Sequence, residues 1–300
     1  MMPFSAQEAF ERNLGLVTPE DQKRLAAATV AIAGCGGVGG LHAHALARLG
    51  IGGFRLADFD TFSVANFNRQ IGATMETVGQ SKVAVTAAMV RSINPDARLD
   101  IFPDGVTREN LDAFIGGASI FVDGLDFFVL DTRRLAFAAA RRAGVPAVTS
   151  GPLGFGATLH VFVPNGMSFD EYFDLQDGGD PFEQLVAFAV GLAPAGLHVP
   201  YLDYGSVNPA TGRGPSSIVG TQMAACLVAT ECVRLLLGRG LSRPAPAWLQ
   251  FDAYRQILRK GRLASGNRGL LQRIKRIVLL KRVRALGWER AVRDREAVSP

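Results

Sequence analysis

A glycine-rich turn between an apolar strand and a helix is the feature that most constrains the fold. The run "VAIAGCGGVGG" places four apolar residues, 30–33, directly before Gly34, Gly36 and Gly39 in the order G-x-G-x-x-G. Glycines at these positions permit a tight turn and let phosphate approach backbone N–H groups at a helix N-terminus. The stretch therefore predicts a strand, a turn and a helix that together form a candidate nucleotide site.

Strand-like and helix-like patterns alternate along the rest of the first half. Alternation of this kind implies parallel strands joined by right-handed crossovers. We therefore expect an α/β protein with a Rossmann-like, doubly wound and largely parallel sheet. The expected strands are 54–57, 99–102, 119–122 and 147–149, and the expected helices are 83–93 and 130–142.

The pattern changes in the second half, where we expect the sheet to continue as a mixed or antiparallel C-terminal part. A β-branched run predicts a strand at 158–163, whereas 168–214 is rich in Gly, Pro and Asp and has little periodicity. Long irregular connections in compact domains tend to be functional or disordered. A helix at 217–237 and one bent strand at 248–258 complete the expected fold.

The charge distribution divides the chain into two parts. Residues 255–300 contain 14 Lys+Arg and 3 Asp+Glu, a net charge of +11, whereas the preceding residues contain 18 and 24, a net charge of −6. A block of one sign usually marks a contact with something anionic or a solvated tail. We therefore expect a nucleotide-binding domain at 1–258, with a crossover and substrate region at 164–216, and a basic helical tail at 259–300.

Polar side chains after the second strand separate this site from a dehydrogenase site. Asp58 ends that strand, where it can accept hydrogen bonds from ribose hydroxyls. The polar residues just past it are Asn66, Arg69, Gln70 and Lys82. They supply donors and two fixed cations where an extended triphosphate would lie. A nicotinamide has no use for such groups, so they favour ATP over NAD.

An acidic motif, "VDGLD", ends a later strand at the same expected edge of the sheet. Its Asp126 is a candidate magnesium ligand, since magnesium prefers a few carboxylates plus substrate oxygens to a complete protein cage. Capping of the helix at 130–142 is the alternative role for Asp126, and Asp123 competes for both roles.

These residues, in this order, resemble the ThiF/MoeB and ubiquitin-activating family of adenylyltransferases. The resemblance rests on "GCGGVGG", "DFDTFSVANFNRQ", "VGQSKV" and "VDGLD", and it runs from about residue 10 to residue 238. It implies a ThiF-type ATP-binding domain with ATP and Mg²⁺ as cofactors. The nucleotide and metal ligands of the family carry over to Gly37, Asp58, Asn66, Arg69, Lys82 and Asp126.

The resemblance also implies a chemistry and an assembly. In the family, a substrate carboxylate attacks the α-phosphate of ATP and gives an acyl-adenylate and pyrophosphate. A carboxylate is already a nucleophile, so the protein has to position and neutralise charge rather than supply a general base. A family arginine reaches into the ATP site of the other protomer, and "ERNLGL" places Arg12 in that role, which implies a homodimer. The expected catalytic residues are therefore Arg12, Arg69, Lys82 and Asp126.

The cysteines depart from the family pattern. Many relatives carry two zinc-binding C-x-x-C pairs and a catalytic cysteine in the loop that crosses over the adenylate. Here Cys35, Cys226 and Cys232 form no C-x-x-C pair, and no thiol lies between the first two. We therefore expect reduced, mostly buried thiols and no cysteine thioester step. The adenylate would be the product or would pass to an amine, a hydroxyl or water.

Phe127 is a further departure, because many relatives have Asn after the magnesium aspartate. It leaves open a catalytically silent nucleotide-binding scaffold, and an NAD-binding oxidoreductase is the other alternative. The carboxylate is also left open between a small molecule, a peptide C-terminus, a ubiquitin-like tail and a modified nucleoside. The four histidines lack metal-ligand spacing, and we expect structural roles for His42 and His44.

The tail segment "RGLLQRIKRIVLLKRVRALGWER" is compatible with a helix whose apolar stripe is rimmed by Arg and Lys, with Trp288 near its end. Such a face suits an anionic membrane surface, and it suits RNA as well. Packing on the acidic domain of the same chain, or on a partner, is the third reading. Without a signal-peptide pattern or an uninterrupted apolar run long enough to cross a bilayer, we expect a cytoplasmic protein, peripheral to a membrane if the tail binds lipid.

Overall fold

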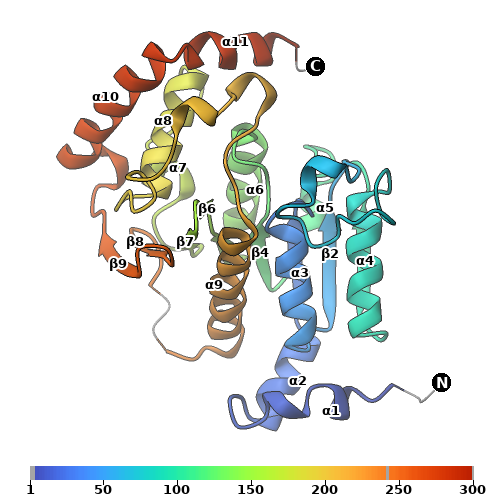
Figure 1. Ribbon diagram of the computed structural model, residues 1–300. Coiled ribbons are helices and arrows are strands. Elements are labelled where there is room, and N and C mark those ends of the chain that lie inside the picture. Colours follow the sequence, from blue (N-terminus) through green and yellow to red (C-terminus); the bar gives the residue numbers. More distant parts are fainter. Residues whose placement is uncertain (1–3, 241–242, 299–300) are drawn as a thin grey trace.

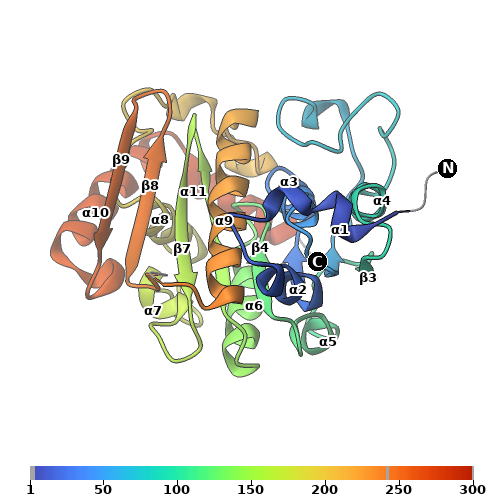
Figure 2. The same ribbon diagram turned by 90° about the horizontal axis from the view of Figure 1, so that it is seen from below.

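A single β-sheet with helices on both faces organises the chain (Figures 1 and 2). The structure is a computed structural model that describes residues 4–240 and 243–298. Its strands are β1 (Thr29–Ala33), β2 (Gly53–Ala57), β3 (Arg98–Phe102), β4 (Ile120–Asp123), β5 (Ala147–Thr149), β6 (Pro152–Leu153), β7 (Gly156–Phe162), β8 (Ala247–Asp252) and β9 (Ile257–Arg262).

The strand order confirms the expected fold class. Across the sheet the strands run β3-β2-β1-β4-β5-β7-β8-β9, and β6 pairs with β7. The strands from β3 to β5 are parallel, and β7, β8 and β9 continue the sheet in antiparallel pairs. The fold is therefore a Rossmann-like, doubly wound sheet with an antiparallel C-terminal part.

The helices form two layers against the sheet and a third, outer layer (Figures 1 and 2). They are α1 (Ala6–Ala9), α2 (Pro19–Ala27), α3 (Gly39–Arg48), α4 (Lys82–Ile93), α5 (Leu111–Ile115), α6 (Leu130–Arg142), α7 (Phe169–Phe173), α8 (Pro181–Leu192), α9 (Ile218–Leu237), α10 (Leu270–Ala285) and α11 (Trp288–Val298). One core joins α2, α3, α4 and α9 to the sheet, and a second joins α5, α6, α7 and α8. The outer layer is α10 and α11, which pack on α8.

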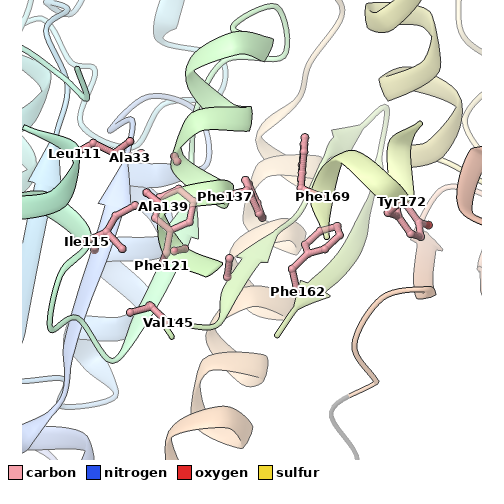
Figure 3. Close-up of a cluster of buried hydrophobic side chains, with 14 of the residues drawn as sticks. Ala33, Leu111, Ile115, Phe121, Phe137, Ala139, Val145, Phe162, Phe169 and Tyr172 are labelled. Carbon is pink, nitrogen blue, oxygen red and sulfur yellow. The ribbon is translucent and has the colours of Figure 1, made fainter. Parts of the chain in front are cut away.

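Alternation along the strands assigns side chains to the two cores. In β1, Val30 and Ile32 belong to the core of α3, α4 and α9, whereas Ala31 and Ala33 belong to the core of α5 and α6. The second core is rich in aromatic rings, and Figure 3 labels Phe121, Phe137, Phe162, Phe169 and Tyr172. Aromatic packing of this kind holds α6 and α7 firmly on the sheet, because each ring buries a large apolar area.

The segment 168–214 is not as irregular as its sequence predicts. It contains the short helix α7 and the longer helix α8. In α8 the buried side chains include Phe182, Leu185, Val186 and Phe188, which lie on more than one side of the helix. Because α8 is enclosed by α7, α10 and α11, it is apolar nearly all round and has no amphipathic period. Periodicity in the sequence therefore gave no sign of it.

Two other expectations about secondary structure need correction. The sequence predicts one bent strand at 248–258, but the structure has two strands, β8 and β9, joined by a turn at Gln256 with a φ of 54°. The pairing of β9 with β8 carries the sheet past residue 258. The helices α1, α2 and α5 are also present where the sequence pattern predicted none.

The basic tail docks on the acidic segment of its own domain. The ion pairs are Arg276–Asp174, Arg284–Glu183 and Arg293–Asp180, with N···O distances of 2.6, 2.9 and 3.1 Å. Trp288, which the sequence suggests for lipid contact, instead packs against Tyr204, with ring centroids 6.3 Å apart. Part of the charge asymmetry between the two halves of the sequence is therefore neutralised within the molecule.

The helix α9 is long and apolar enough to cross a membrane, but it packs as a core helix. Val228 and Cys232 are buried between α9 and the sheet. Cys35 is also buried, as expected. Cys226 is exposed, so the expectation of burial is wrong for that thiol, which lies on the outer side of the helix with Gln222.

The backbone makes its closest approach where β1 and β4 end. These strands are neighbours, but the chain leaves β1 toward β2 and leaves β4 toward β5, and at such a switch point a doubly wound sheet has its ligand crevice. A Cβ on Gly39 would overlap the carbonyl oxygen of Gly34, and a Cβ on Gly34 would overlap that of Gly124. Gly34 also has a φ of 86°, which favours glycine. The crevice therefore depends on three glycines, of which the motif predicted two.

The side chain of His42 points from α3 into the core, as a structural role requires. Its side chain is fully buried, and neither ring nitrogen has a hydrogen-bond partner within the described residues. Burial lowers the pKa of His42 to about 3. His44, on the same helix, is only partly buried and accepts a hydrogen bond from Arg48.

We expect Gly39→Ala to destabilise the fold by about 3 kcal/mol, because the added methyl group overlaps backbone that cannot move independently. Gly36→Ala is the matched control: its Cβ would meet the Gln70 side chain at 3.6 Å, which is an ordinary contact. Urea unfolding of both variants measures the difference. Equal stability of the two variants would contradict the close approach of the loops.

Lowering the pH from about 7 to about 5 should reduce the free energy of unfolding of the wild-type protein more than that of the His42→Leu variant. We expect the difference between the two losses to be about 2 kcal/mol. The unfolded chain protonates His42 below its ordinary pKa near 6.5, whereas the folded protein excludes that proton until about pH 3. Stability is therefore present above the unfolded pKa and is lost as the pH falls. Urea unfolding at both pH values measures it, with His44→Leu as the control that keeps most of the dependence. Parallel losses in wild type and His42→Leu would disprove the assignment.

Candidate nucleotide site

The glycine turn is braced from the side of β2 by an acidic residue. One carboxylate oxygen of Asp58 accepts the N–H of Cys35 at 2.6 Å, and the other accepts the N–H of Asp60 at 2.8 Å. Burial raises the pKa of Asp58, and these two N–H donors and Lys82 oppose the rise. Each oxygen still has a free lone pair for a hydroxyl donor. Asp58, the residue that we expect to contact the ribose, therefore also fixes the shape of the glycine turn.

Lys82 lies beside Asp58 but is already paired. Its ammonium is 2.9 Å from the Asp60 carboxylate, and its side chain is 8% exposed. Its backbone N–H donates to the carbonyl of Asp60, at the start of α4. The sequence pattern alone does not single out Asp60 as a site residue, although Asp60 follows Asp58 by two residues in the quoted motif. The acid holds the Lys82 side chain in one place at the carboxyl edge of the sheet.

Gln70 presents an unpartnered group to the glycine turn. Its side chain is 7% exposed, and its amide oxygen has no hydrogen-bond partner within the described residues. The amide group lies next to Gly36, since a Cβ placed there would be 3.6 Å from its nitrogen. A buried polar atom without a partner is costly, so this oxygen is a candidate hydrogen-bond acceptor beside the turn.

Arg69 lies on the other side of the turn, in range of Asp126. Burial lowers the pKa of Arg69, the Asp126 carboxylate opposes this shift, and Arg213 adds to it, so both charges lie within electrostatic range of Arg69. The guanidinium donates to the carbonyl of Ala65 at 2.9 Å, and its stem lies near Gly37. The sequence predicted two of these three charges. Arg213 was missed because it comes from the crossover region, far away in the sequence.

Asn66 has a local role in this structure. Its side-chain oxygen accepts the N–H of Ser63 at 3.0 Å, which closes the 3₁₀ turn Val64–Asn66. Two contacts then tie this segment to α9: Asn68 donates to the carbonyl of Ser216 at 2.9 Å, and Thr221 donates to that of Arg69 at 3.3 Å. The turn that Asn66 closes therefore positions Arg69. The side-chain oxygen of Asn66 is used within that turn, where it accepts the N–H of Ser63.

A buried arginine shapes the loop that carries Asp126. Arg133 donates to the Asp123 carboxylate at 2.8 Å and to the carbonyls of Leu125 and Asp126 at 2.6 and 3.1 Å. Thr149 donates to the same carboxylate at 2.7 Å. Asp123 is thus fully engaged within the protein, which leaves Asp126 as the carboxylate of this loop that is open to a ligand. The sequence offered no sign of Arg133, which looks like an ordinary surface residue of α6.

Asp126 is exposed at the edge of the crevice. Its carboxylate accepts the N–H of Phe128 at 3.0 Å, and the remaining lone pairs face outward. The cap residue of α6 is Val129, which makes no side-chain cap hydrogen bond, so neither Asp126 nor Asp123 caps that helix. Within the described residues no group of three His, Cys, Asp or Glu side chains could hold a metal alone.

Phe127 points away from the crevice. Its ring lies 5.3 Å from that of Phe188 on α8, and the Arg133 guanidinium lies 4.9 Å from the same Phe188 ring. The residue that departs from the family pattern therefore helps to fasten the loop to α8. It gives no specific support to the alternative of a catalytically silent scaffold.

Arg12 is far from the nucleotide site of its own chain. It lies on the exposed 3₁₀ turn Glu11–Asn13 (Figure 1). Phe10, two residues earlier, packs beneath Gly50, at the C-terminal end of α3, whereas the glycine turn lies at the N-terminal end of that helix. Arg12 therefore does not join the other candidate residues within one chain.

Two curated relatives match parts of the chain. It is similar to the tRNA threonylcarbamoyladenosine dehydratase of Escherichia coli strain K12, 39% identical over 128 residues, which cover 42% of this chain and 47% of that protein. It is also similar to the sulfur carrier protein ThiS adenylyltransferase of the same strain, 32% identical over 145 residues, 48% and 57% of the two chains. The chain spans about half the length of the curated relatives it matches.

Solved structures share the fold over most of the chain. A crystal structure of E. coli MccB with selenomethionine MccA aligns with a TM-score of 0.66 at 18% identity, covering 88% of this chain and 74% of that one. The E. coli dehydratase TcdA in complex with ATP aligns with a TM-score of 0.59 at 23% identity, covering 80% and 98%. At these identities the likeness shows the fold alone. The ThiF family profile matches residues 10–269, and this chain therefore belongs to the ThiF family.

Proposed function

We propose that the protein adenylates a substrate carboxylate: the carboxylate attacks the α-phosphate of ATP, and an acyl-adenylate and pyrophosphate form. The observation that carries the proposal lies at the switch point of the sheet: the Arg69 stem lies beside the glycine turn, and Asp126 and Arg213 lie within electrostatic range of Arg69. Two cations and one carboxylate suit a magnesium triphosphate better than a nicotinamide. Membership of the ThiF family and a relative named as an adenylyltransferase give independent support.

The residues around the turn suit the nucleoside and its phosphates. The free lone pairs of Asp58 would accept ribose hydroxyls, and the amide oxygen of Gln70 would accept a donor of the nucleotide. Backbone N–H groups at the start of α3 and the positive end of its dipole would hold phosphate oxygens. Lys82, held by Asp60, would supply a cation on the ribose side.

Asp126 would hold the magnesium ion, which neutralises phosphate charge when it is bound. Magnesium usually takes one or two carboxylates and completes its shell with phosphate oxygens and water. The exposed carboxylate of Asp126 fits such a shell. Arg133 fixes the loop beneath it by binding the carbonyl of Asp126 itself.

The transfer step needs charge stabilisation rather than a base. A carboxylate oxygen donates an electron pair to form the new bond to the α-phosphorus. The bond from that phosphorus to the oxygen that bridges it to the β-phosphate breaks, and pyrophosphate leaves with the electron pair of the broken bond. Arg69 and Arg213 would stabilise the growing negative charge on the phosphates. Fixed cations in a partly buried crevice do this with little rearrangement, and the effective dielectric there is lower than in water.

We propose no thioester step after the adenylate. Burial raises the pKa of the thiols of Cys35 and Cys232, which keeps them protonated and unreactive. Cys226 is exposed, but it lies five residues after Thr221 on α9, about 140° round the helix from the side that contacts Arg69. The adenylate would therefore be the product or would pass to an amine, a hydroxyl or water.

The substrate carboxylate would enter beneath the crossover region. That region, 164–216, contributes Arg213 to the site. The names of two similar proteins contain a modified tRNA nucleoside and a sulfur carrier protein, which support a modified nucleoside and a carrier-protein tail. A peptide C-terminus or a small carboxylic acid would also reach the site. Together these proteins support a flexible carboxylate-bearing substrate as the general class.

We also propose a homodimer in which Arg12 completes the site of the partner subunit. Arg12 is exposed and distant from the site of its own chain, so it can serve a nucleotide only across an interface. An interface of this kind would be two-fold symmetric, since each protomer both gives and receives an arginine.

We expect Arg69→Ala to weaken ATP binding by at least about tenfold, because a phosphate loses a charged hydrogen-bond partner. Asp126→Asn should abolish carboxylate-dependent ATP–pyrophosphate exchange while the fold remains intact. Isothermal titration with ATP and magnesium measures the first effect. Isotope exchange with a panel of peptide, nucleoside and small carboxylates measures the second.

Arg91→Ala and Asp96→Asn are the matched controls for these variants. Both residues are exposed at the far end of α4, away from the crevice, and should change neither measurement. If the Arg69→Ala variant bound ATP as tightly as the wild-type protein does, the proposed nucleotide site would be disproved. Binding of NAD in preference to ATP would disprove the function.

Mixed dimers test the role of Arg12. Arg12→Ala and Arg69→Ala should each be inactive alone, but unfolding and refolding them together should restore about a quarter of wild-type exchange, because half of the random dimers carry one intact site. The measurement is exchange activity of the mixture. No recovery in a mixture shown to contain heterodimers would place Arg12 outside the partner's site.

A further inference from the structure

The outer face of α10 carries an apolar stripe that the fold does not use. Leu270, Leu271, Ile274, Ile277 and Val278 are 73, 71, 49, 54 and 61% exposed. Their spacing places them on one side of the helix, because residues three, four and seven apart share a face. Branched aliphatic side chains on one side of a surface helix form a contiguous patch, which commonly marks an interaction site.

The opposite face of α10 already holds the helix in place. Gln272 and Val283 are buried, and Leu279 and Leu280 pack into the cluster around α8. Lys275 donates to the carbonyl of Pro194 at 2.7 Å. The stripe is therefore not an unfilled part of the core, and Figure 1 shows α10 at the outside of the molecule.

The charge around the stripe is entirely positive. The helix has six Arg or Lys residues and no Asp or Glu. Several of its cations are engaged with the domain, but Arg273 and Lys281 lie on the exposed side, and no ion pair links them to an acid within the described residues. The edge strand β9, at the same end of the molecule, adds Arg259, Lys260 and Arg262 (Figures 1 and 2).

We propose that α10 docks the protein on an anionic membrane surface, lying in the plane of the interface. The five aliphatic side chains would enter the boundary between headgroups and acyl chains, while Arg273 and Lys281 would contact lipid phosphates. Each cation near such a surface adds attraction, and the apolar stripe supplies the part of the binding that salt does not screen. This proposal is independent of the adenylation chemistry.

Charge and chemistry select the lipid surface over other occupants. A second copy of this chain would bring a face with the same cations, and a symmetric contact would oppose like charges. RNA would satisfy the cations, but it binds through phosphates and through stacking on aromatic or arginine planes, so five exposed aliphatic side chains would gain nothing. An anionic lipid surface is complementary to both features at once.

Vesicle co-sedimentation of the full chain tests the proposal. Wild type should bind phosphatidylglycerol-containing vesicles and should bind vesicles of phosphatidylcholine alone far more weakly. The double variant Leu270→Gln/Leu271→Gln, which keeps the charge, should bind the anionic vesicles at least about tenfold more weakly, because two apolar side chains no longer enter the bilayer. Arg273→Gln/Lys281→Gln should weaken binding about tenfold as well, through the loss of two cations.

The control variants are Leu16→Gln and Met75→Gln, which are 82 and 77% exposed on other parts of the surface and should bind as wild type does. Thermal unfolding should be unchanged in all variants, since none of these side chains is buried. Equal binding to both kinds of vesicle, or full binding by the double leucine variant, would overturn the proposal. The proposal would also be overturned if wild type bound no vesicles and instead bound RNA or associated with itself, and if the double leucine variant lost that RNA binding or self-association.

Discussion

The close approach of two loops at the end of β1 and β4 is the constraint on which the site depends. Gly34 and Gly124 bring the loops into backbone contact, and Gly39 lets α3 begin directly above them. With no side chains between the loops, the glycine turn lies directly under the start of α3, and Asp58 can reach the N–H of Cys35. The charged groups then collect on both sides of a rigid backbone, Lys82 near β2 and the Arg69 group near β4.

The sequence predicted the parts of this site that are local. The strand–turn–helix pattern and the order of Asp58, Arg69, Lys82 and Asp126 follow from spacing along the chain and from the rule that parallel strands end at one edge. The groups that hold them in place were not predictable, because their partners are distant in sequence or hidden by burial. Arg133 looks like a surface residue until the loop folds over it, and α8 has no clear period because nearly every side of it is covered.

The charge asymmetry has a similar explanation. A sequence shows an acidic segment and a basic tail, but not whether each one finds the other or a partner. In the structure, pairs such as Arg276–Asp174 join residues about a hundred positions apart, and they bind the inner face of α10 to the domain. Surface pairs of this kind contribute little each, but they fix the orientation of the helix. That orientation decides which apolar residues are left outside.

The tail is also connected to the nucleotide site through one short segment. The helix α11 packs on the 3₁₀ turn Pro209–Thr211, which lies inside a tight loop closed by two backbone hydrogen bonds between Asn208 and Arg213. Arg213 in turn lies in electrostatic range of Arg69. A loop with few partners of its own would otherwise be free to move its arginine away from the phosphates. The tail is therefore part of the framework that positions a charge at the site, whatever its outer face binds.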